Sequence, residues 1–281
     1  MRRAAVLAVA LVALSGCDVW RVFFPAKVYE TEPPELPADL AEPAILVFTK
    51  TNGFRHREAI PAGLERIRAI AERRGWSLFH TENGAVFNAD QLARFAAVVW
   101  HNTSGDTLGP GQKRDFRAWM EGGGGFVGIH GAGGDPSYEW DWYVEELLRA
   151  QFTAHIMGPQ FQPATLRIED RDHPATRHLE ETWTHTEEWY SFEASPRGRG
   201  VRVLASVDES TYVPVADFLW INRDLRMGDH PVIWSHCVGR GRALFSALGH
   251  RAEAYALPEY RGVLEGAIAW AAGLEGDACP D

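Results

Sequence analysis

The stretch GGGGFVGIHGAGG, residues 122–134, places a histidine at the end of a short apolar strand. Residues 126–129 are apolar or small, and a glycine-rich turn through His130 and Gly131 follows. A strand, a tight turn and a following helix make the geometry of a nucleophile elbow, which lifts one side chain above the C-terminal edge of a parallel sheet. Here that group is an imidazole, which suits proton transfer or metal binding. The alternative is a structural turn in which His130 only hydrogen-bonds its neighbours.

Two other predicted strands also lead into histidines. His56 follows the apolar run 44–48 through a polar loop, and His101 and Asn102 follow the run 96–100. Because the C-terminal ends of parallel strands lie along one edge of a sheet, we expect the three imidazoles to converge in one cleft at that edge. A single histidine is usually a structural residue with its hydrogen bonds satisfied, and that alternative applies to each of them.

Further histidines and carboxylates occur later in the chain, and we expect the same cleft to draw on them. Glu188 precedes Trp189 and Tyr190, as a carboxylate beside a sugar-stacking ring does. The alternatives are a solvated turn for the carboxylates and core packing for the rings. The predicted catalytic residues are His130, Glu188 and His56, the predicted substrate-binding residues are His101, Asn102, His155, Trp189, Tyr190 and His250, and His185, Glu187 and His236 complete the cleft.

Two kinds of chemistry fit these residue types. Histidines with a carboxylate can hold a divalent metal that polarises a carbonyl or activates water, and His130, His155 and His236 are the candidate ligands. The chain contains no H-x-x-x-H or H-E-x-x-H spacing, so a metal site would have to assemble from distant loops. In the other chemistry, an imidazole and a carboxylate act as acid and base on a C–H or O–H bond. The cofactor is therefore left open, with a divalent metal as the candidate.

The elements that position these side chains alternate along the chain. Continuous apolar runs predict buried strands, and apolar residues every three or four positions predict helices. This alternation predicts an α/β fold, a three-layer sandwich with a mostly parallel central sheet. The predicted strands are 44–48, 76–80, 96–100, 126–129, 164–168, 189–192, 201–207, 231–236 and 243–246, and the predicted helices are 59–74, 89–95, 110–121, 138–149 and 263–272.

The composition is that of a globular protein, with 281 residues of which 46% are hydrophobic and 23% are charged. This length is compatible with one large α/β domain or two small ones. No internal repeat or linker divides the chain, so we expect one domain over residues 44–275. The formal net charge of −10 argues against nucleic acid as a partner.

The N-terminus has the pattern of an export signal. A basic start precedes an apolar run, residues 4–13, that is too short to span a bilayer. The sequence LSGC that ends at Cys17 resembles a bacterial lipobox, which implies cleavage before Cys17 and a lipid on its thiol. We therefore expect a signal peptide over residues 1–16. The alternatives are an ordinary cleaved signal and an N-terminal membrane anchor.

Residues 17–43 are acidic and proline-rich, which is typical of a tether between a membrane and a folded domain. The expected location is the cell envelope, on the periplasmic face, with the membrane reached through the lipid on Cys17. Asp18 resembles the signal that keeps some lipoproteins in the inner membrane, and it slightly favours that membrane. If Cys17 is acylated, Cys237 and Cys279 remain as thiols. An oxidising compartment permits a disulfide between them, but the sequence leaves the pairing open.

Six motifs in order resemble the ThuA-like, or trehalose-utilisation, family. They span roughly residues 44 to 273, nearly the whole mature domain. Each motif is short, and the match is specific because all six occur in sequence. They are GFRH at 53–56, GGFVGIHGA at 124–132, FTAH at 152–155, EEWY at 187–190, GDHP at 228–231 and LGHR at 248–251.

This resemblance implies a fold similar to that of class I glutamine amidotransferases, which is flavodoxin-like. In those enzymes the elbow carries a catalytic cysteine, whereas this chain has His130 there, so glutamine hydrolysis through a thiolate is excluded at this site. The family is linked to sugar utilisation, particularly of disaccharides such as trehalose and their keto-sugar derivatives. The resemblance thus implies a small carbohydrate as the partner of the cleft.

Two functions of different classes follow. The first is a carbohydrate-related enzyme that acts on a glycoside or keto-sugar by hydrolysis, elimination or isomerisation, with convergent His and Glu side chains. The second is a non-catalytic sugar-binding or scaffold lipoprotein on the same fold, with a cleft filled by its own side chains. The polar strand ends favour the first.

Overall fold

The computed structural model describes residues 21, 24–136, 138–218 and 221–279. The predicted signal peptide, residues 1–16, and the predicted lipidation site Cys17 lie outside the described residues, so both stay predictions.

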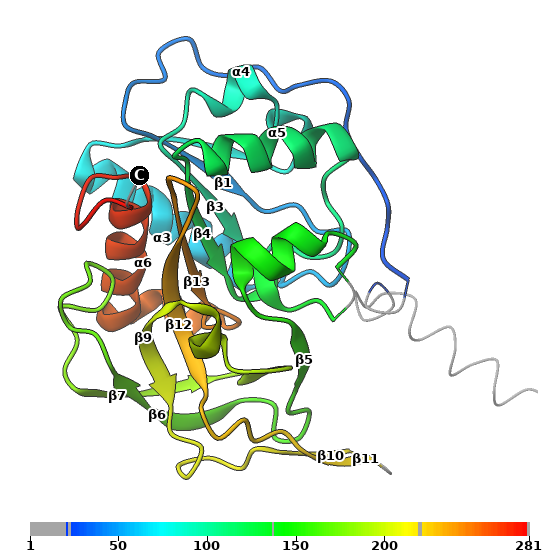
Figure 1. Cartoon of the computed structure of the whole chain (residues 1–281), viewed down its shortest axis with the longest axis vertical. Helices are drawn as coiled ribbons and strands as arrows, with labels where there is room; N and C mark the ends of the chain where they lie inside the picture. The colour runs from blue at the N-terminus through cyan, green and yellow to red at the C-terminus, as the bar shows by residue number, and fades with distance from the viewer. Residues whose placement is uncertain (1–20, 22–23, 137, 219–220, 280–281) are drawn as a thin grey trace, which may run out of the picture.

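A nine-stranded sheet with the order β2-β1-β3-β4-β13-β12-β9-β6-β7 forms the centre of the molecule (Figure 1). Its first five strands are all parallel. The order 2-1-3-4-5 of these strands, counted within the parallel half, is that of flavodoxin-like sheets. The five strands are β1 (Ala44–Phe48), β2 (Ser77–Thr81), β3 (Ala97–His101), β4 (Gly125–Ile129) and β13 (Gly241–Ser246).

Antiparallel pairing extends the sheet beyond β13. The four added strands are β12 (Pro231–Val238), β9 (Arg202–Val207), β6 (Gln162–Ile168) and β7 (Thr182–Glu187). Each pairs antiparallel with the strand before it in the sheet, so within this sheet only β12 and β6 run against the parallel direction. The mostly parallel central sheet predicted from the sequence is confirmed.

Helices cover both faces of this sheet (Figure 1). α3 (Ala59–Arg74) packs beside α6 (Pro258–Ala271), while α5 (Pro110–Glu121) packs beside the short α4 (Ala89–Leu92). The crossovers from β1 to β2 and from β3 to β4 move toward opposite edges of the sheet, and right-handed crossovers in opposite directions place their helices on opposite faces. The predicted three-layer α/β sandwich is confirmed.

Two helices predicted near the elbow differ in extent from the structure. The helix predicted from residue 138 begins later, at residue 141, and continues as η3 (Tyr143–Leu148). The carbonyl of Trp140 accepts the N–H groups of Tyr143 and Val144 at its start. The helix expected after the elbow is a single 3₁₀ turn, η2 (His130–Gly133). A Cβ on Gly133 would lie 2.4 Å from the Phe245 ring of β13, so this turn passes close to the sheet and leaves no room for a side chain at position 133. The remaining elements are η1 (Gly84–Val86), β5 (Phe152–His155), β8 (Tyr190–Phe192), η4 (Pro196–Arg199), β10 (Val215–Phe218), β11 (Ile221–Asp224) and η5 (Ala252–Ala256).

Residues 24–43, the described part of the predicted tether, lie along the domain. The Ala26 N–H donates to the carbonyl of Asn52 at 2.7 Å. The Lys50 ammonium lies 2.5 Å from the Glu30 carboxylate, and only 6% of the Lys50 side chain is exposed. These contacts brace the loop after β1, which carries His56. The role of the segment as a membrane tether stays a prediction.

Cys237 in β12 is disulfide-bonded to Cys279, with their Cα atoms 5.8 Å apart. The bond fastens the segment that follows α6 to the sheet. The sequence had left this pairing open, because the distance between the two residues depends on the tertiary fold.

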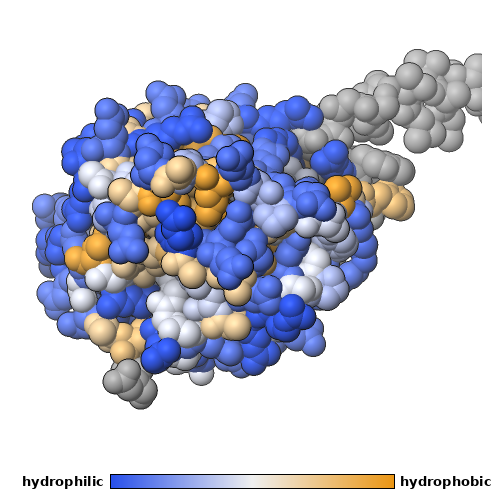
Figure 2. Space-filling view, turned by 90° about the horizontal axis from the view of Figure 1, so that it is seen from above, coloured by the Kyte–Doolittle hydropathy of each residue, from blue (hydrophilic) through white to orange (hydrophobic). Residues whose placement is uncertain are grey.

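Among the described residues, no helix is both long enough and apolar enough to cross a bilayer. The face shown in Figure 2 is mostly polar, with small separate apolar patches. The large apolar side chains that are exposed are Phe24, Val28, Met157, Val213 and Leu274.

Candidate active site

His130 stands at the end of β4 with a backbone φ of 45°, in the left-handed region that is uncommon for residues other than glycine. Its side chain has no exposed surface, and its Nδ1 lies 2.7 Å from the carbonyl oxygen of Ala247. A carbonyl only accepts, so Nδ1 donates and Nε2 directs its lone pair to the other side of the ring. Strained backbone of this kind clusters at functional turns.

Asn102 makes a second left-handed turn, with φ 52°, directly after β3. Its Oδ1 accepts the N–H of Gly131 at 3.2 Å, and its Nδ2 donates to the carbonyl of Gly249 at 3.1 Å. Asn102 therefore ties together the turns that follow β3, β4 and β13. It positions the loops of the site and has no side-chain group left over for a substrate.

Three further side chains meet His130, each from a different loop. They are His56 after β1, Glu188 between β7 and β8, and His250 after β13, and one ligand atom from each of the four lies within 4.8 Å of all the others. The Nε2 of His130 lies 3.0 Å from Nδ1 of His250 and 3.4 Å from Oε2 of Glu188. The His56 ring stands edge-on to the other two imidazoles, with centroids 4.9 and 4.6 Å apart.

Glu188 joins this cluster to a fourth histidine. Its Oε2 lies 3.0 Å from Nδ1 of His250, while its Oε1 accepts from Nε2 of Gln160 at 2.5 Å and lies 3.1 Å from Nδ1 of His155. Burial alone would raise the pKa of Glu188, but the neighbouring imidazoles of His130 and His250 outweigh it and lower the pKa well below its usual value. The carboxylate is therefore ionised at neutral pH.

Glu187 supports the cluster from behind. Its carboxylate accepts the N–H of Gly249 at 2.6 Å, of His250 at 3.3 Å and of Glu188 at 2.9 Å. These bonds fix the loop that carries His250 and the backbone of Glu188. Both carboxylates of the EEWY motif are thus buried and specifically bonded, and the solvated-turn alternative does not apply to them.

Tyr190 packs its ring against that of His130, with centroids 4.2 Å apart, and its hydroxyl donates to Nε2 of His130 at 2.8 Å. Burial raises the pKa of Tyr190 well above its usual value, and the neighbouring carboxylates raise it further, so the hydroxyl stays protonated. In His56, burial lowers the pKa, and the nearby imidazoles of His130 and His250 lower it further, which keeps the ring neutral.

Other predicted site residues lie elsewhere. His101 is fully buried, with Nε2 3.1 Å from the carbonyl oxygens of Ala59 and Ile60 at the start of α3. His236 lies in β12 and bonds the carbonyl of Glu146 through Nε2. Both rings are outside the group formed by His56, His130, Glu188 and His250.

Two more members of the predicted cleft are core residues in this fold. Trp189 is buried, with its indole N–H donated to the carbonyl of Gln162 at 2.9 Å, so it offers no face to a sugar. His185 is buried in β7, with Nε2 3.5 Å from a carboxylate oxygen of Glu187.

The loop between β5 and β6 contributes two residues that sequence patterns do not mark. Gln160 holds Glu188, and the Phe161 ring packs edge-on against His250 at 4.9 Å. A third, Phe54, packs against His56 at 4.9 Å. The only sequence signal was the position of Phe54 inside the GFRH motif.

The GDHP motif does not contact the cluster itself but holds the strand that carries Tyr190. His230 links the carboxylate of Glu209, 2.9 Å from Nδ1, to the carbonyl of Tyr190, 2.7 Å from Nε2. Burial raises the pKa of Glu209, but the bond to His230 and two backbone N–H groups outweigh it and lower the pKa to about 2. This chain of contacts fixes β8, which carries Tyr190.

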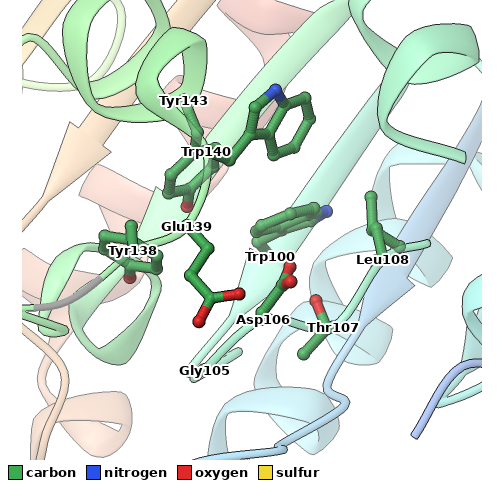
Figure 3. A pocket seen from close by; sticks show the side chains of 9 residues that line it. All are labelled: Trp100, Gly105, Asp106, Thr107, Leu108, Tyr138, Glu139, Trp140 and Tyr143. Atoms are coloured by element: carbon green, nitrogen blue, oxygen red, sulfur yellow. The ribbon is translucent and has the colours of Figure 1, made fainter. Parts of the chain in front are cut away.

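A small cavity lies between the end of β3, the loop that follows it and the aromatic residues around Trp140 (Figure 3). Its volume of about 10 Å³ is about what one water needs, so it does not fit a sugar. Tyr138 and Tyr143 from its wall both donate to the carbonyl of Ala132 at 2.6 Å, which steadies the turn after His130. The cavity is lined by Trp100, Gly105, Asp106, Thr107, Leu108, Tyr138, Glu139, Trp140 and Tyr143.

A flavodoxin-like sheet with a histidine at its elbow and a His/Glu cluster along its C-terminal edge defines an α/β protein with a site at the strand ends. The chain belongs to the ThuA (trehalose utilisation) family, whose sequence profile matches residues 44–271. No curated protein matches the chain significantly.

Solved structures with a similar fold include two putative ThuA-like proteins. That of Bacteroides uniformis is 22% identical, with 85% of this chain and 95% of that chain covered and a TM-score of 0.70. That of Parabacteroides merdae is 17% identical, with 82% and 89% covered and a TM-score of 0.61. A β-galactosidase from Rahnella is 13% identical, with 84% and 32% covered and a TM-score of 0.51. At these identities the likeness shows the fold alone.

Proposed function

We propose that the protein is an enzyme of carbohydrate utilisation that acts on a disaccharide or keto-sugar at the cluster around His130. The observation that carries this proposal is the shared carboxylate of Glu188, which holds His155 with one oxygen and His250 with the other. The trehalose-utilisation family supports a sugar as the substrate. The histidine at the elbow, where a thiol would be needed, argues against amidotransferase chemistry.

The edge of the cluster that a sugar can reach is formed by His155 and His250. Their side chains are 26% and 16% exposed, whereas those of His130 and Glu188 are 0% and 3% exposed. The half-buried ring of Phe161 beside His250 adds a flat apolar face of the kind on which sugar rings stack.

We assign proton transfer to His155. The carbonyl of Ile156 accepts the Nδ1–H of this imidazole at 3.2 Å, with Glu188 3.1 Å away, which leaves Nε2 as the basic nitrogen. Nε2 takes a proton from a sugar carbon next to a carbonyl, the electron pair of the broken C–H bond moves to the carbonyl oxygen, and Glu188 stabilises the imidazolium. Return of that proton to a neighbouring atom completes an isomerisation, or loss of a leaving group completes an elimination.

Replacement of His155 by glutamine is expected to lower kcat by about 10²–10⁴-fold with a smaller change in KM, because the base is lost while polar contact to the sugar remains. The measurement is turnover of 3-keto-glycosides by the purified protein, because these sugars have the carbonyl that this step requires and trehalose has none. His178→Gln removes an exposed histidine outside the cluster and should behave as wild type. An unchanged kcat in His155→Gln would rule out this assignment.

A second candidate is a non-catalytic sugar-binding or scaffold protein. It is favoured by the way the cluster fills its own space, with His130 fully buried and bonded to a backbone carbonyl. Such a protein would bind the same sugars saturably in calorimetry and return them unchanged, whereas an enzyme would give product.

For the location, we propose the periplasmic side of the cell envelope, with a lipid on Cys17 after removal of residues 1–16. The Cys237–Cys279 disulfide supports an oxidising compartment. Cys17→Ser is expected to move the protein from the membrane fraction to the soluble fraction, because the lipid chains supply the membrane affinity. Retention of the variant in the membrane fraction would favour an uncleaved N-terminal anchor.

A further inference from the structure

We propose that His56, His130, His250 and Glu188 form a binding site for one divalent transition-metal ion, with zinc as the best match. The proposal deepens the function given above and rests on it only for the role of the metal in a reaction, because metal binding can be measured without any sugar. Of the metal ligands predicted from the sequence, His130 is kept. His56, His250 and Glu188, which the fold brings together around it, take the place of His155 and His236.

Three of the ligand atoms already have the spacing of metal ligands. Nε2 of His130, Nδ1 of His250 and Oε2 of Glu188 are 3.0, 3.0 and 3.4 Å apart. Four ligands at about 2.0–2.1 Å from a tetrahedral zinc ion lie about 3.3 Å from one another. The atom of His56 is within 4.8 Å of the other three, so an adjustment of that side chain completes the set.

The tautomer of His130 suits a metal ligand. Its Nδ1 donates to the carbonyl of Ala247, so Nε2 carries the lone pair, which accepts the Tyr190 hydroxyl at 2.8 Å and would exchange that bond for the metal. A ligand histidine that donates its other N–H to a backbone carbonyl is the usual arrangement around zinc. Glu188 is oriented in the same manner, because Gln160 and His155 hold Oε1 and leave Oε2 for the cluster.

The side chain of His56 gives independent support for a bound metal ion. Its side chain is buried, with 7% of the residue exposed, and its Nδ1 has no hydrogen-bond partner among the described residues. Most buried polar atoms in proteins have a partner, so this ring nitrogen calls for an explanation. A metal ion between the four side chains gives one, since the His56 ring is edge-on to both His130 and His250.

The charge around the cluster also favours a cation. Two carboxylates, those of Glu187 and Glu188, lie at the cluster with 0% and 3% of their side chains exposed. Their partners among the described residues are imidazoles, one amide and backbone N–H groups. Buried anions without a full counter-charge are costly, and a divalent ion offsets that cost.

The donor set selects the kind of metal. Three imidazole nitrogens and one carboxylate oxygen suit zinc and its first-row neighbours, whereas magnesium and calcium require oxygen ligands. A metal held by these four side chains would polarise a sugar carbonyl by taking its oxygen as a fifth ligand, next to the His155 base.

Zinc binding by the full chain tests this site. The protein is purified without a histidine tag, stripped with chelator and dialysed against zinc, and bound metal is measured by mass spectrometry. We expect one zinc per chain. We expect His250→Ala and Glu188→Gln to weaken zinc affinity, measured by competition with a chromogenic chelator, by at least about 100-fold. His236→Ala, which removes a histidine outside the cluster, should bind as wild type.

An absence of bound zinc in the wild type, or equal zinc affinity in the wild type and the two cluster variants, would overturn the proposal. If a variant fails to fold, the visible absorption of the wild type loaded with Co²⁺ tests the site instead. A four-coordinate site with nitrogen and oxygen ligands gives the intense absorption of tetrahedral cobalt. A six-coordinate surface site gives only weak absorption and would contradict the proposal. Zinc binding without sugar turnover would support the metal site and contradict the proposed enzymatic function. Sugar turnover by a protein that binds no zinc would support the enzymatic function and overturn the metal site.

Discussion

A His130→Asn variant is expected to lose about 10³-fold or more in kcat/KM on the sugar substrate while its unfolding temperature stays within a few degrees of wild type. The imidazole is the member of the cluster that contacts His250, Glu188 and Tyr190 through a single nitrogen, so its removal separates all three. Asparagine tolerates the left-handed backbone at φ 45° better than alanine does, which limits the cost to the fold.

The matched control is His236→Asn. It also removes a buried imidazole that is bonded to a backbone carbonyl, but one that lies outside the cluster. Its turnover should equal that of wild type after correction for folded protein. Turnover retained in His130→Asn, or lost equally in both variants, would show that the elbow is structural.

The second large effect is on stability. Replacement of both Cys237 and Cys279 by serine is expected to lower the free energy of unfolding by about 4 kcal/mol, because the bond closes a loop of 42 residues and restricts the unfolded chain. The measurement is urea denaturation of the wild type and the double variant at one pH. Sugar turnover should be unchanged at temperatures where the variant is folded, since neither cysteine contacts the cluster.

Reductant supplies the control for this prediction. It should lower the urea midpoint of the wild type to that of the double variant, and it should leave the double variant unaffected. A wild-type midpoint that does not respond to reductant under unfolding conditions would contradict the presence of the bond.

The parallel half of the fold was predictable because its strands are buried on both faces. The runs 44–48 and 96–100 are continuously apolar, and the structure places both inside the parallel half of the sheet, each between two other strands. β7 was missed because its sequence, TWTHTE, alternates threonine with buried residues and resembles a polar loop. The position of such a strand is set by its pairing with β6, which residue patterns do not show.

The candidate site was predictable only where strand ends determined it. His56 and His130 converge as expected, but His101 is the last residue of β3 and its ring points to α3, while Asn102 takes the turn toward the cluster. Neighbouring side chains of an extended segment point in opposite directions. For the same reason Trp189 is buried against Gln162, while the next residue, Tyr190, contacts His130. Gln160 lies in a loop without any periodic pattern, so only the tertiary structure reveals it.

A crystal structure of the wild-type protein soaked with trehalose or a 3-keto-disaccharide tests the central claim most directly. The account predicts sugar density within hydrogen-bond distance of His155 and His250, against the ring of Phe161. Sugar bound only elsewhere on the molecule, with the His130 cluster undisturbed, would contradict it.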